Sequence, residues 1–337
     1  MLATSPRASI VVCTYDETRM EDLDECIQSL LKQSLYDLEV VVAVDHNHEL
    51  HSVLSERYRD SRVNVVLNNS VNLGQASTMN WAVEHSCGEI VCFIDDDAVA
   101  DPDWLSHITN AYDDDTIAVG GRIEPLWIGK KQAYLPAEFY WMVGATGKYL
   151  PNRVREVRNL WSSNISYRKA LLEEVGPVSE TMGRGSQLFQ CEDAEFGLRI
   201  WMVTGKAVKY VPTAIVYHKI YPDRLGLPSL FKRAYEQGYA KAHIAELHGT
   251  ESYHGTPWRD YALSVEREYL WSVIRSSCGA LARLVLGPDR KCVFEQLVFT
   301  FCATLIVLLG FLIGSAQARP IPCQDDWSCS HSGRPIR

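Results

Sequence analysis

The stretch Ile90-Val91-Cys92-Phe93-Ile94-Asp95-Asp96-Asp97-Ala98 joins five mostly apolar residues directly to three carboxylates. An apolar run of this length is typical of a strand buried on both faces. The carboxyl end of such a strand borders the crevice in which open α/β sheets bind ligands. Asp95 and Asp97 lie on the same side of an extended chain, so both could bind one Mg²⁺ or Mn²⁺ ion. A solvated acidic turn is the alternative interpretation.

Strand-like and helix-like segments alternate around this stretch. The strand-like segments are residues 9–14, 38–44, 63–67 and 90–94. The segments with helical spacing are residues 21–33, 50–59 and 74–86, and Asp101-Pro102 is expected to open a further helix. This alternation predicts an α/β fold with a mostly parallel central sheet flanked by helices.

The alternation breaks after residue 120. Residues 125–151 are rich in Trp, Tyr, Pro and Gly and predict a long loop or irregular insert, which at this length is usually functional. Regular structure is expected again at residues 160–167, 192–203, 208–217 and 229–247.

Composition excludes some classes of function. The chain has 337 residues and a formal charge of −9, with no block of Lys and Arg, so nucleic acid is not an expected partner. Its ten cysteines show no C-x-x-C spacing. Scattered cysteines predict reduced thiols in the cytoplasm rather than a disulfide framework or a zinc site.

The C-terminal region differs in composition from the rest. Leu297 to Gly314 is apolar except for two threonines, which is long enough for a transmembrane helix, although a buried helix of a soluble domain is the alternative. The basic residues lie on its N-terminal side, which predicts a cytoplasmic location for the large domain. Trp258 to Leu286 interleaves aromatic residues with arginines, as expected of a helix on the membrane surface or of one packed on the large domain.

The sequence therefore predicts four parts. They are a catalytic domain at residues 1–250, an amphipathic membrane-proximal segment at 251–290, a transmembrane helix at 291–316 and a short tail at 317–337.

Two more groups of residues could carry chemistry. Glu192-Asp193 opens a predicted helix, where negative charge is favoured, and ordinary helix capping is the alternative role. Adjacent side chains are expected to point to different sides, so only one of them would act as a base. The preceding Gly183-Arg184-Gly185-Ser186 could close over a substrate. His218 follows a predicted strand and is either a metal ligand or a structural histidine.

Several motifs occur in the order found in family 2 glycosyltransferases of the GT-A fold, and the resemblance covers about residues 8–245. The motifs are Cys13-Thr14-Tyr15-Asp16-Glu17, Val44-Asp45, Asn72-Leu73-Gly74 with Asn80, Asp95-Asp96-Asp97, Glu192-Asp193 and His218. Three more segments resemble the archaeal glucosyl-dolichyl-phosphate glucuronosyltransferases: Val119-Gly120-Gly121-Arg122, Leu135-Pro136-Ala137-Glu138-Phe139-Tyr140-Trp141 and Ser163-Asn164-Ile165-Ser166-Tyr167-Arg168.

The resemblance implies a role for each of these positions. The donor nucleotide sugar would be bound by Thr14, Tyr15, Glu17, Asp45, Asn72, Gly74, Asn80, Asp95 and Asp96. A Mn²⁺ or Mg²⁺ ion would be held by Asp97, Asp95 and His218. Asp193 would be the catalytic base with Glu192 beside it, and the acceptor side would be lined by Trp161, Ser163 and Asn164.

The expected function is that of an inverting, metal-dependent glycosyltransferase. By resemblance it would move glucuronic acid from a UDP-sugar to a dolichyl-phosphate-linked saccharide, for N-glycosylation of S-layer proteins at the cytoplasmic face of the cell membrane. The Q-x-x-R-W motif of processive synthases is missing from residues 233–239, which favours transfer of a single sugar. The alternatives are a polyprenyl-phosphate monosaccharide synthase, a cell-surface polysaccharide glycosyltransferase and a non-catalytic sugar-nucleotide-binding membrane scaffold.

Overall fold

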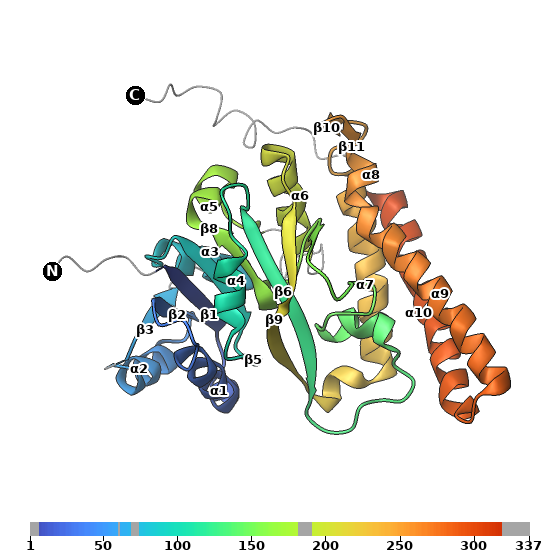
Figure 1. Ribbon diagram of the computed structural model, residues 1–337, viewed down its shortest axis with the longest axis horizontal. Helices are drawn as coiled ribbons and strands as arrows, with labels where there is room; N and C mark the ends of the chain where they lie inside the picture. The colour runs from blue at the N-terminus through green and yellow to red at the C-terminus, as the bar shows by residue number, and fades with distance from the viewer. Residues whose placement is uncertain (1–6, 60, 69–73, 181–190, 319–337) are drawn as a thin grey trace.

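The computed structural model describes residues 7–59, 61–68, 74–180 and 191–318 (Figure 1). Residues 8–95 contain four strands in the order β3-β2-β1-β4, and every neighbouring pair is parallel, as the alternation predicts. The strands are β1 (Ala8–Thr14), β2 (Leu38–Asp45), β3 (Val63–Asn68) and β4 (Ile90–Asp95). The helices between them are η1 (Glu17–Arg19), α1 (Met20–Leu31), α2 (His48–Arg57) and α3 (Gln75–Glu84).

Beyond β4 the sheet is mixed, and the full order of the described strands is β3-β2-β1-β4-β8-β6-β9-β5, with β7 also paired to β9. Strand β8 is antiparallel to β4 and β6, β6 is parallel to β9, and β5 and β7 are antiparallel to β9. The bounds are β5 (Ala98–Ala100), β6 (Ala118–Trp127), β7 (Arg155–Val157), β8 (Ile165–Arg168) and β9 (Val208–Ile220). The parallel arrangement thus ends close to where the alternation of strands and helices ends in the sequence.

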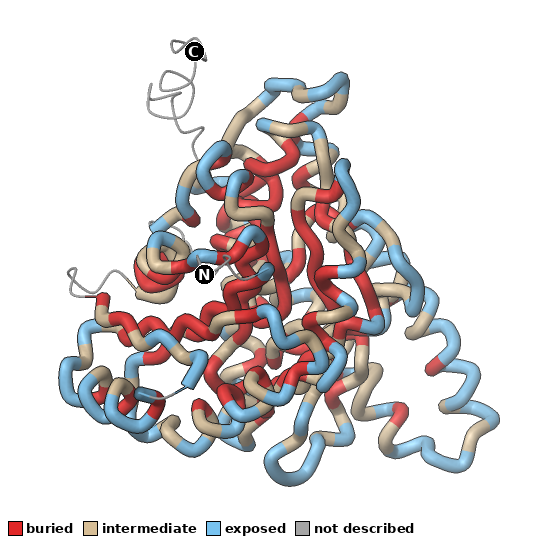
Figure 2. Tube along the Cα trace, turned by 60° about the vertical axis from the view of Figure 1, so that its left-hand side comes forward, coloured by how far each residue is buried: buried red, intermediate tan, exposed pale blue. Residues whose placement is uncertain are grey.

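Helices cover both faces of the sheet, so its strands form the buried centre of the molecule (Figure 2). Successive residues of β1 illustrate this, because Ile10 and Val12 pack into one core and Val11 packs into the other. The first core is closed by α1, α2 and α4 (Trp104–Asn110). The second core is closed by α3, α5 (Lys169–Val175) and α6 (Glu192–Thr204). Because helices cover both faces of the sheet, the side chains on both sides of strands such as β1 are buried. The sequences of these strands are therefore continuous apolar runs.

A bulge between β6 and β9 directs the second half of β9 toward the acidic turn. The pairing register shifts between Gly121 and Arg122. A side chain at Gly121 would collide with the carbonyl oxygen of Ala214, so the backbones can approach only at a glycine. Beyond the bulge β9 also pairs with β5, where His218 lies opposite Ala98. The fold therefore places His218 beside the residues that follow β4.

The C-terminal part adds long helices on one side of the domain (Figure 1). The long helices are α7 (Leu227–Glu246), α9 (Ser264–Leu286) and α10 (Arg290–Gln317), and the short helix α8 (Trp258–Ala262) lies between α7 and α9. The segment η4 (Pro222–Leu225) precedes α7, and a small hairpin of β10 (Ser252–Tyr253) and β11 (Thr256–Pro257) lies between α7 and α8. Among the described helices, α10 alone is long and apolar enough to cross a membrane.

The segment from Trp258 to Leu286 divides between the two roles considered for it. Trp258 is buried and its Nε1 donates to the carbonyl of Ile244 at 2.9 Å, so the segment begins packed on the domain. Trp271, Val285 and Leu286 are exposed farther along α9. The beginning of the segment therefore packs on the domain, and the later part of α9 is exposed at the surface.

Two local predictions differ from the structure. Helix α4 begins at Trp104 rather than at Pro102, because the carbonyl and the carboxylate of Asp101 bind the amides of Trp104 and Asp103 in a turn that precedes the helix. The insert at residues 125–151 is also more regular than predicted. Strand β6 continues to Trp127, and η2 (Ala137–Val143) is a helical segment with a largely buried face.

Candidate active site

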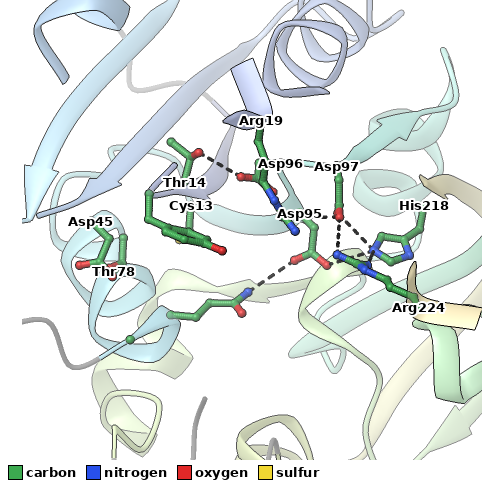
Figure 3. Close-up of a pocket in the computed structure, with 13 residues that line it drawn as sticks. Cys13, Thr14, Arg19, Asp45, Thr78, Asp95, Asp96, Asp97, His218 and Arg224 are labelled. Carbon is green, nitrogen blue, oxygen red and sulfur yellow. Dashed lines mark hydrogen bonds and ion pairs between the residues drawn. The ribbon is translucent and has the colours of Figure 1, made fainter. Parts of the chain in front are cut away.

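The turn after β4 gathers three candidate metal ligands. Asp95 is the last residue of the strand, Asp97 follows two residues later, and His218 reaches the turn from β9 (Figure 3). The His218 Nε2 atom lies 3.2 Å from an oxygen of Asp97 and 3.9 Å from an oxygen of Asp95. One ligand atom from each residue falls within a group no wider than 4.8 Å. The structure thus brings together the three residues that the sequence assigned to the metal.

Two arginines, neither of them predicted, share this turn. Arg224 of η4 lies 2.9 Å from Asp97, and Arg19 of η1 lies 3.6 Å from it. Burial raises the pKa of Asp97, but its contacts with His218, Arg224 and Arg19 outweigh burial and hold the pKa below its usual value. Asp97 is therefore ionised at neutral pH and surrounded by cationic donors.

Asp96 points away from the other two acids. Its carboxylate accepts hydrogen bonds from the Thr14 hydroxyl at 3.0 Å and from Arg19 at 2.8 Å (Figure 3). Burial, together with the charges of Asp97 and Asp95, raises the pKa of Asp96 to about 6 despite the charge of Arg19. Successive side chains of an extended chain point to alternate sides, which explains why the Asp96 side chain points away from Asp95 and Asp97. Asp96 therefore ties β1 and η1 to the acidic turn, although it also lines the adjoining cavity.

A cavity opens beside this turn at the carboxyl ends of β1, β2 and β4. Six of the residues predicted to bind the donor line it: Thr14, Tyr15, Asp45, Gly74, Asp95 and Asp96. Burial raises the pKa of Asp45, and its buried Oδ1 has no hydrogen-bond partner among the described residues. A lining residue with an unpaired polar atom is suited to bind a polar ligand.

Of the other three residues predicted to bind the donor, Glu17 and Asn80 are described and do not line this cavity. Glu17 is exposed on η1. The Asn80 side chain is held by the backbone of Val178, with its Oδ1 accepting at 2.9 Å and its Nδ2 donating at 3.0 Å. Asn80 therefore joins α3 to the segment after α5. Asn72 lies outside the described residues, as does the segment Gly183-Arg184-Gly185-Ser186.

Glu192 and Asp193 form the first turn of α6 and line a second cavity. Consecutive helical residues are about 100° apart, so both side chains can border one cavity even though they point in different directions. An oxygen of Asp193 accepts a hydrogen bond from the Ser162 amide at 3.2 Å. Burial raises the pKa of Asp193 well above its usual value, and the charges of Glu192 and Asp95 raise it further. A carboxylate with a raised pKa is suited to accept a proton.

The two cavities share a boundary. Gln75, Asp95, His218 and Arg224 line both of them. A group bound at this boundary would adjoin both the acid–imidazole cluster and the Glu192–Asp193 pair. A leaving group and an attacking nucleophile could then be served by different residues of the same space, as a single displacement requires.

Two of the residues predicted to contact the acceptor, Trp161 and Ser163, line the second cavity. Asn164 does not. It is fully buried, accepts a hydrogen bond from Trp104 Nε1 at 2.8 Å, and donates to the carbonyls of Arg122 and Ala214. The Asn164 side chain therefore joins α4, β6 and β9 and does not face a substrate. Its polar partners lie far away in the chain, so no local pattern could reveal this role.

A third cavity continues from the second toward the C-terminal helices. Trp141, Trp161 and Gln237 line both, and the third cavity adds Tyr149, Tyr269 and Lys241. At its wall Glu266 lies 2.7 Å from Arg158 and 3.3 Å from Lys241, so two cations share one carboxylate. Burial lowers the pKa of Lys241, and Arg158 with Lys241 lowers the pKa of Glu266 to about 2 against the effect of burial. The cavity is aromatic, with an excess of positive charge at one end.

Sequence reasoning missed the cations of the site and the contribution of the insert. Arg19 follows the Thr14-Tyr15 motif by a few residues and Arg224 follows His218 by six, so their nearness to predicted ligands was an available signal. Trp141 lay in a motif quoted for the resemblance. Lys241 showed no local signal, because its partner Glu266 lies in α9, distant from it in the chain.

Comparisons with known proteins agree with this geometry. The sequence profile described as "Glycosyl transferase family 2" matches residues 9–176. The glucosyl-dolichyl phosphate glucuronosyltransferase of Haloferax volcanii is 36% identical over 238 residues, which cover 70% of this chain and 76% of that protein. The chain belongs to glycosyltransferase family 2. It is therefore an enzyme that transfers sugars, and the resemblance seen in its motifs is confirmed.

Solved structures confirm the fold. The mannosyltransferase PcManGT from Pyrobaculum calidifontis, in complex with GDP-Man and Mn²⁺, has a TM-score of 0.55 at 17% identity and covers 91% of this chain and 88% of its own. GalNAc-T7 with UDP, GalNAc and Mn²⁺ has a TM-score of 0.52 at 14% identity, covering 80% of this chain and 55% of its own. At these identities the likeness concerns the GT-A-like fold alone.

Proposed function

We propose that this glycosyltransferase moves glucuronic acid from a UDP-sugar to a dolichyl-phosphate-linked saccharide, with inversion at the anomeric carbon, in an archaeal pathway of protein N-glycosylation that serves the S-layer. The observation that carries the proposal is the 36% identity to the Haloferax volcanii glucuronosyltransferase over most of both chains. The continuous path through the three cavities supports a large acceptor, because it leads from the acidic turn past Asp193 to the C-terminal helices.

The donor would occupy the first cavity. Asp45, with its unpaired buried oxygen, would bind the base, and Thr14 and Tyr15 would border the nucleoside. Arg19 and Arg224 would hold the diphosphate, because charge-assisted hydrogen bonds from guanidinium groups suit phosphate oxygens.

The residues of the acidic turn fit a divalent cation. Two carboxylates and one imidazole within 4.8 Å form a ligand set that suits Mn²⁺ and, through its oxygens, Mg²⁺. Asp95, Asp97 and His218 would hold the ion. When bound, such an ion supplies Lewis-acid neutralisation of the departing diphosphate.

Asp193 would accept the proton of the acceptor hydroxyl. Its raised pKa makes it a better proton acceptor than an ordinary aspartate, and the Ser162 amide fixes its orientation. The acceptor sugar would lie against Trp141 and Trp161, and Lys241 would face the phosphate of the lipid carrier.

Attachment to the cytoplasmic face of the cell membrane is part of the proposal. The long apolar helix α10 is the candidate anchor, and Arg275, Arg283 and Arg290 lie on its N-terminal side. A lipid-linked acceptor requires the catalytic domain to work at a membrane surface, which these features support.

The test is a donor and acceptor panel with purified protein and Mn²⁺. UDP-glucuronic acid, UDP-glucose and GDP-mannose are each offered with a glucosyl-phospho-polyprenol and with the bare polyprenyl phosphate. The proposal expects consumption of UDP-glucuronic acid with the glucosylated lipid. Transfer to the bare phosphate would instead identify a polyprenyl-phosphate monosaccharide synthase.

A further inference from the structure

Helix α10 is attached lengthwise to the catalytic domain. The rings of Phe299 and Phe231 stack at 5.8 Å near one end of the contact, and the Tyr239 hydroxyl donates to Gln317 at 2.9 Å near the other. The contact between α7 and α10 is the most extensive of all helix–helix contacts in the described residues. It runs along nearly the whole apolar stretch that hydropathy assigns to a membrane span.

Glycines make this contact a close one. A side chain at Gly238 of α7 would collide with the backbone of Val307, and one at Gly310 of α10 would collide with the backbone of Tyr235. A Cβ atom at Gly314 would lie 2.7 Å from the carbonyl oxygen of Tyr239. Small residues on both helices allow the backbones to touch. Helix α10 is therefore held as a component of the domain rather than as a separate segment.

An upright α10 would conflict with this packing. Residues 297–314 would fill the hydrocarbon layer, at roughly 27 Å for 18 residues. Helix α7 would then enter the same layer with Lys232, whose side chain is 75% exposed, and with Arg233 and Lys241, which line the catalytic cavities. Charged groups are strongly disfavoured at that depth.

The face of α10 opposite α7 is continuously apolar. Its exposed residues recur every three or four positions and carry no charge; they are Phe294, Val298, Phe301, Leu305, Leu308 and Leu312. Such spacing defines one side of a helix. The adjoining helix α9 exposes Trp271, Ile274 and Val285. Arg275, Arg283 and Arg290 lie nearby, and none forms an ion pair with a residue that the structure describes.

We propose that α10, together with the exposed half of α9, lies in the plane of the membrane and enters one anionic leaflet without crossing it. Its apolar face would be immersed in the acyl region, and the arginines would bind lipid headgroups. Both ends of α10 then remain on the side of the catalytic domain. This refines the membrane attachment in the proposed function, but its test measures topology and not sugar transfer, so each can fail without the other.

The topology test uses the full chain in sealed inverted membrane vesicles. A site for a specific protease is inserted after Gln317, and in a second variant after Lys130, an exposed loop position of the catalytic domain. We expect protease added outside to cleave both sites without detergent. Cleavage at the loop alone, with the C-terminal site protected until detergent is added, would establish a membrane span and overturn the proposal.

A binding test addresses the leaflet itself. The double variant Phe301→Gln and Leu312→Gln removes two apolar side chains that are 65% and 67% exposed. Its partition onto phosphatidylglycerol vesicles should fall by at least roughly tenfold, because that apolar surface no longer enters the lipid. The matched control is Val154→Gln and Val203→Gln, two exposed residues outside α9 and α10, which should leave binding unchanged. Equal losses in both variants, or no loss in the α10 variant, would refute the docking surface.

Discussion

Replacing Asp193 with Asn tests the assignment of the catalytic base. The amide has nearly the same volume, and its oxygen can still accept the hydrogen bond from the Ser162 amide. Asp193 does not line the first cavity, in which we propose that the donor binds, so donor affinity should change little. What the variant loses is the ability to accept a proton.

The loss should appear in kcat. Removal of a general base costs a factor of about 10²–10⁴, which corresponds to ~2.7–5.5 kcal/mol in the activation barrier. Unlike kcat, the stability of the D193N variant should not decrease. The folded state raises the pKa of Asp193, so its ionised form destabilises the fold, and this destabilisation grows as pH rises through the raised pKa. The neutral amide should therefore keep or increase the melting temperature at neutral pH.

The assay measures kcat against pH with saturating donor and acceptor, alongside donor affinity by calorimetry. The wild-type rate should rise with pH through the raised pKa of Asp193, because only the ionised carboxylate accepts a proton. In the D193N variant that ascending limb should disappear while donor affinity stays within roughly threefold of wild type.

Glu192→Gln is the matched control, since Glu192 lies in the same helical turn and lines the same cavity. It should retain most of its activity, with an altered pH profile because its charge raises the pKa of Asp193. An active D193N variant beside an inactive E192Q variant would refute the assignment and make Glu192 the base.

Three further predictions concern the metal, the acceptor and the C-terminal helices. Asp97→Ala should abolish donor binding measured by calorimetry, and EDTA should inactivate the wild type reversibly on addition of Mn²⁺; full activity in chelator would contradict the metal site. Lys241→Met should raise the KM for the acceptor about tenfold while leaving the donor KM unchanged, because Lys241 lines the third cavity and does not line the first; equal effects on both would indicate a folding defect. Gly310→Val should lower the free energy of unfolding by about 1–3 kcal/mol, because its side chain would collide with α7. Gly279→Ala, in open space on α9, is its control and should be neutral or stabilising in the same thermal melt.

The N-terminal half of the fold could be predicted because its signals are local. Strand β4 is an apolar run that ends in carboxylates, and its burial between two helical layers is what makes that run continuous. The proximity of Asp95, Asp97 and His218 could also be predicted. Parallel α/β sheets place residues at the carboxyl ends of their strands along one edge, and these three residues occur in the order found in the family.

The remaining features depend on contacts between distant parts of the chain. Asn164 and Asn80 have side chains occupied by backbone groups that only the tertiary structure brings near. The hydropathy of α10 likewise reflects only its composition. Its packing on α7 depends on glycines in both helices, which allow the two backbones to approach closely. No sequence window that contains only one partner can reveal these roles.

The bulge that carries β9 to β5 has a consequence for biosynthesis. Asp95 and Asp97 leave the ribosome long before His218 and Arg224, the residues that hold Asp97 in the finished protein. A partly made chain therefore holds carboxylates whose partners are still missing, and it cannot bind a nucleotide sugar in the way the finished enzyme would. The acidic turn is complete only after β9 has inserted beside β6. The ability to bind the donor therefore indicates that the whole sheet has formed.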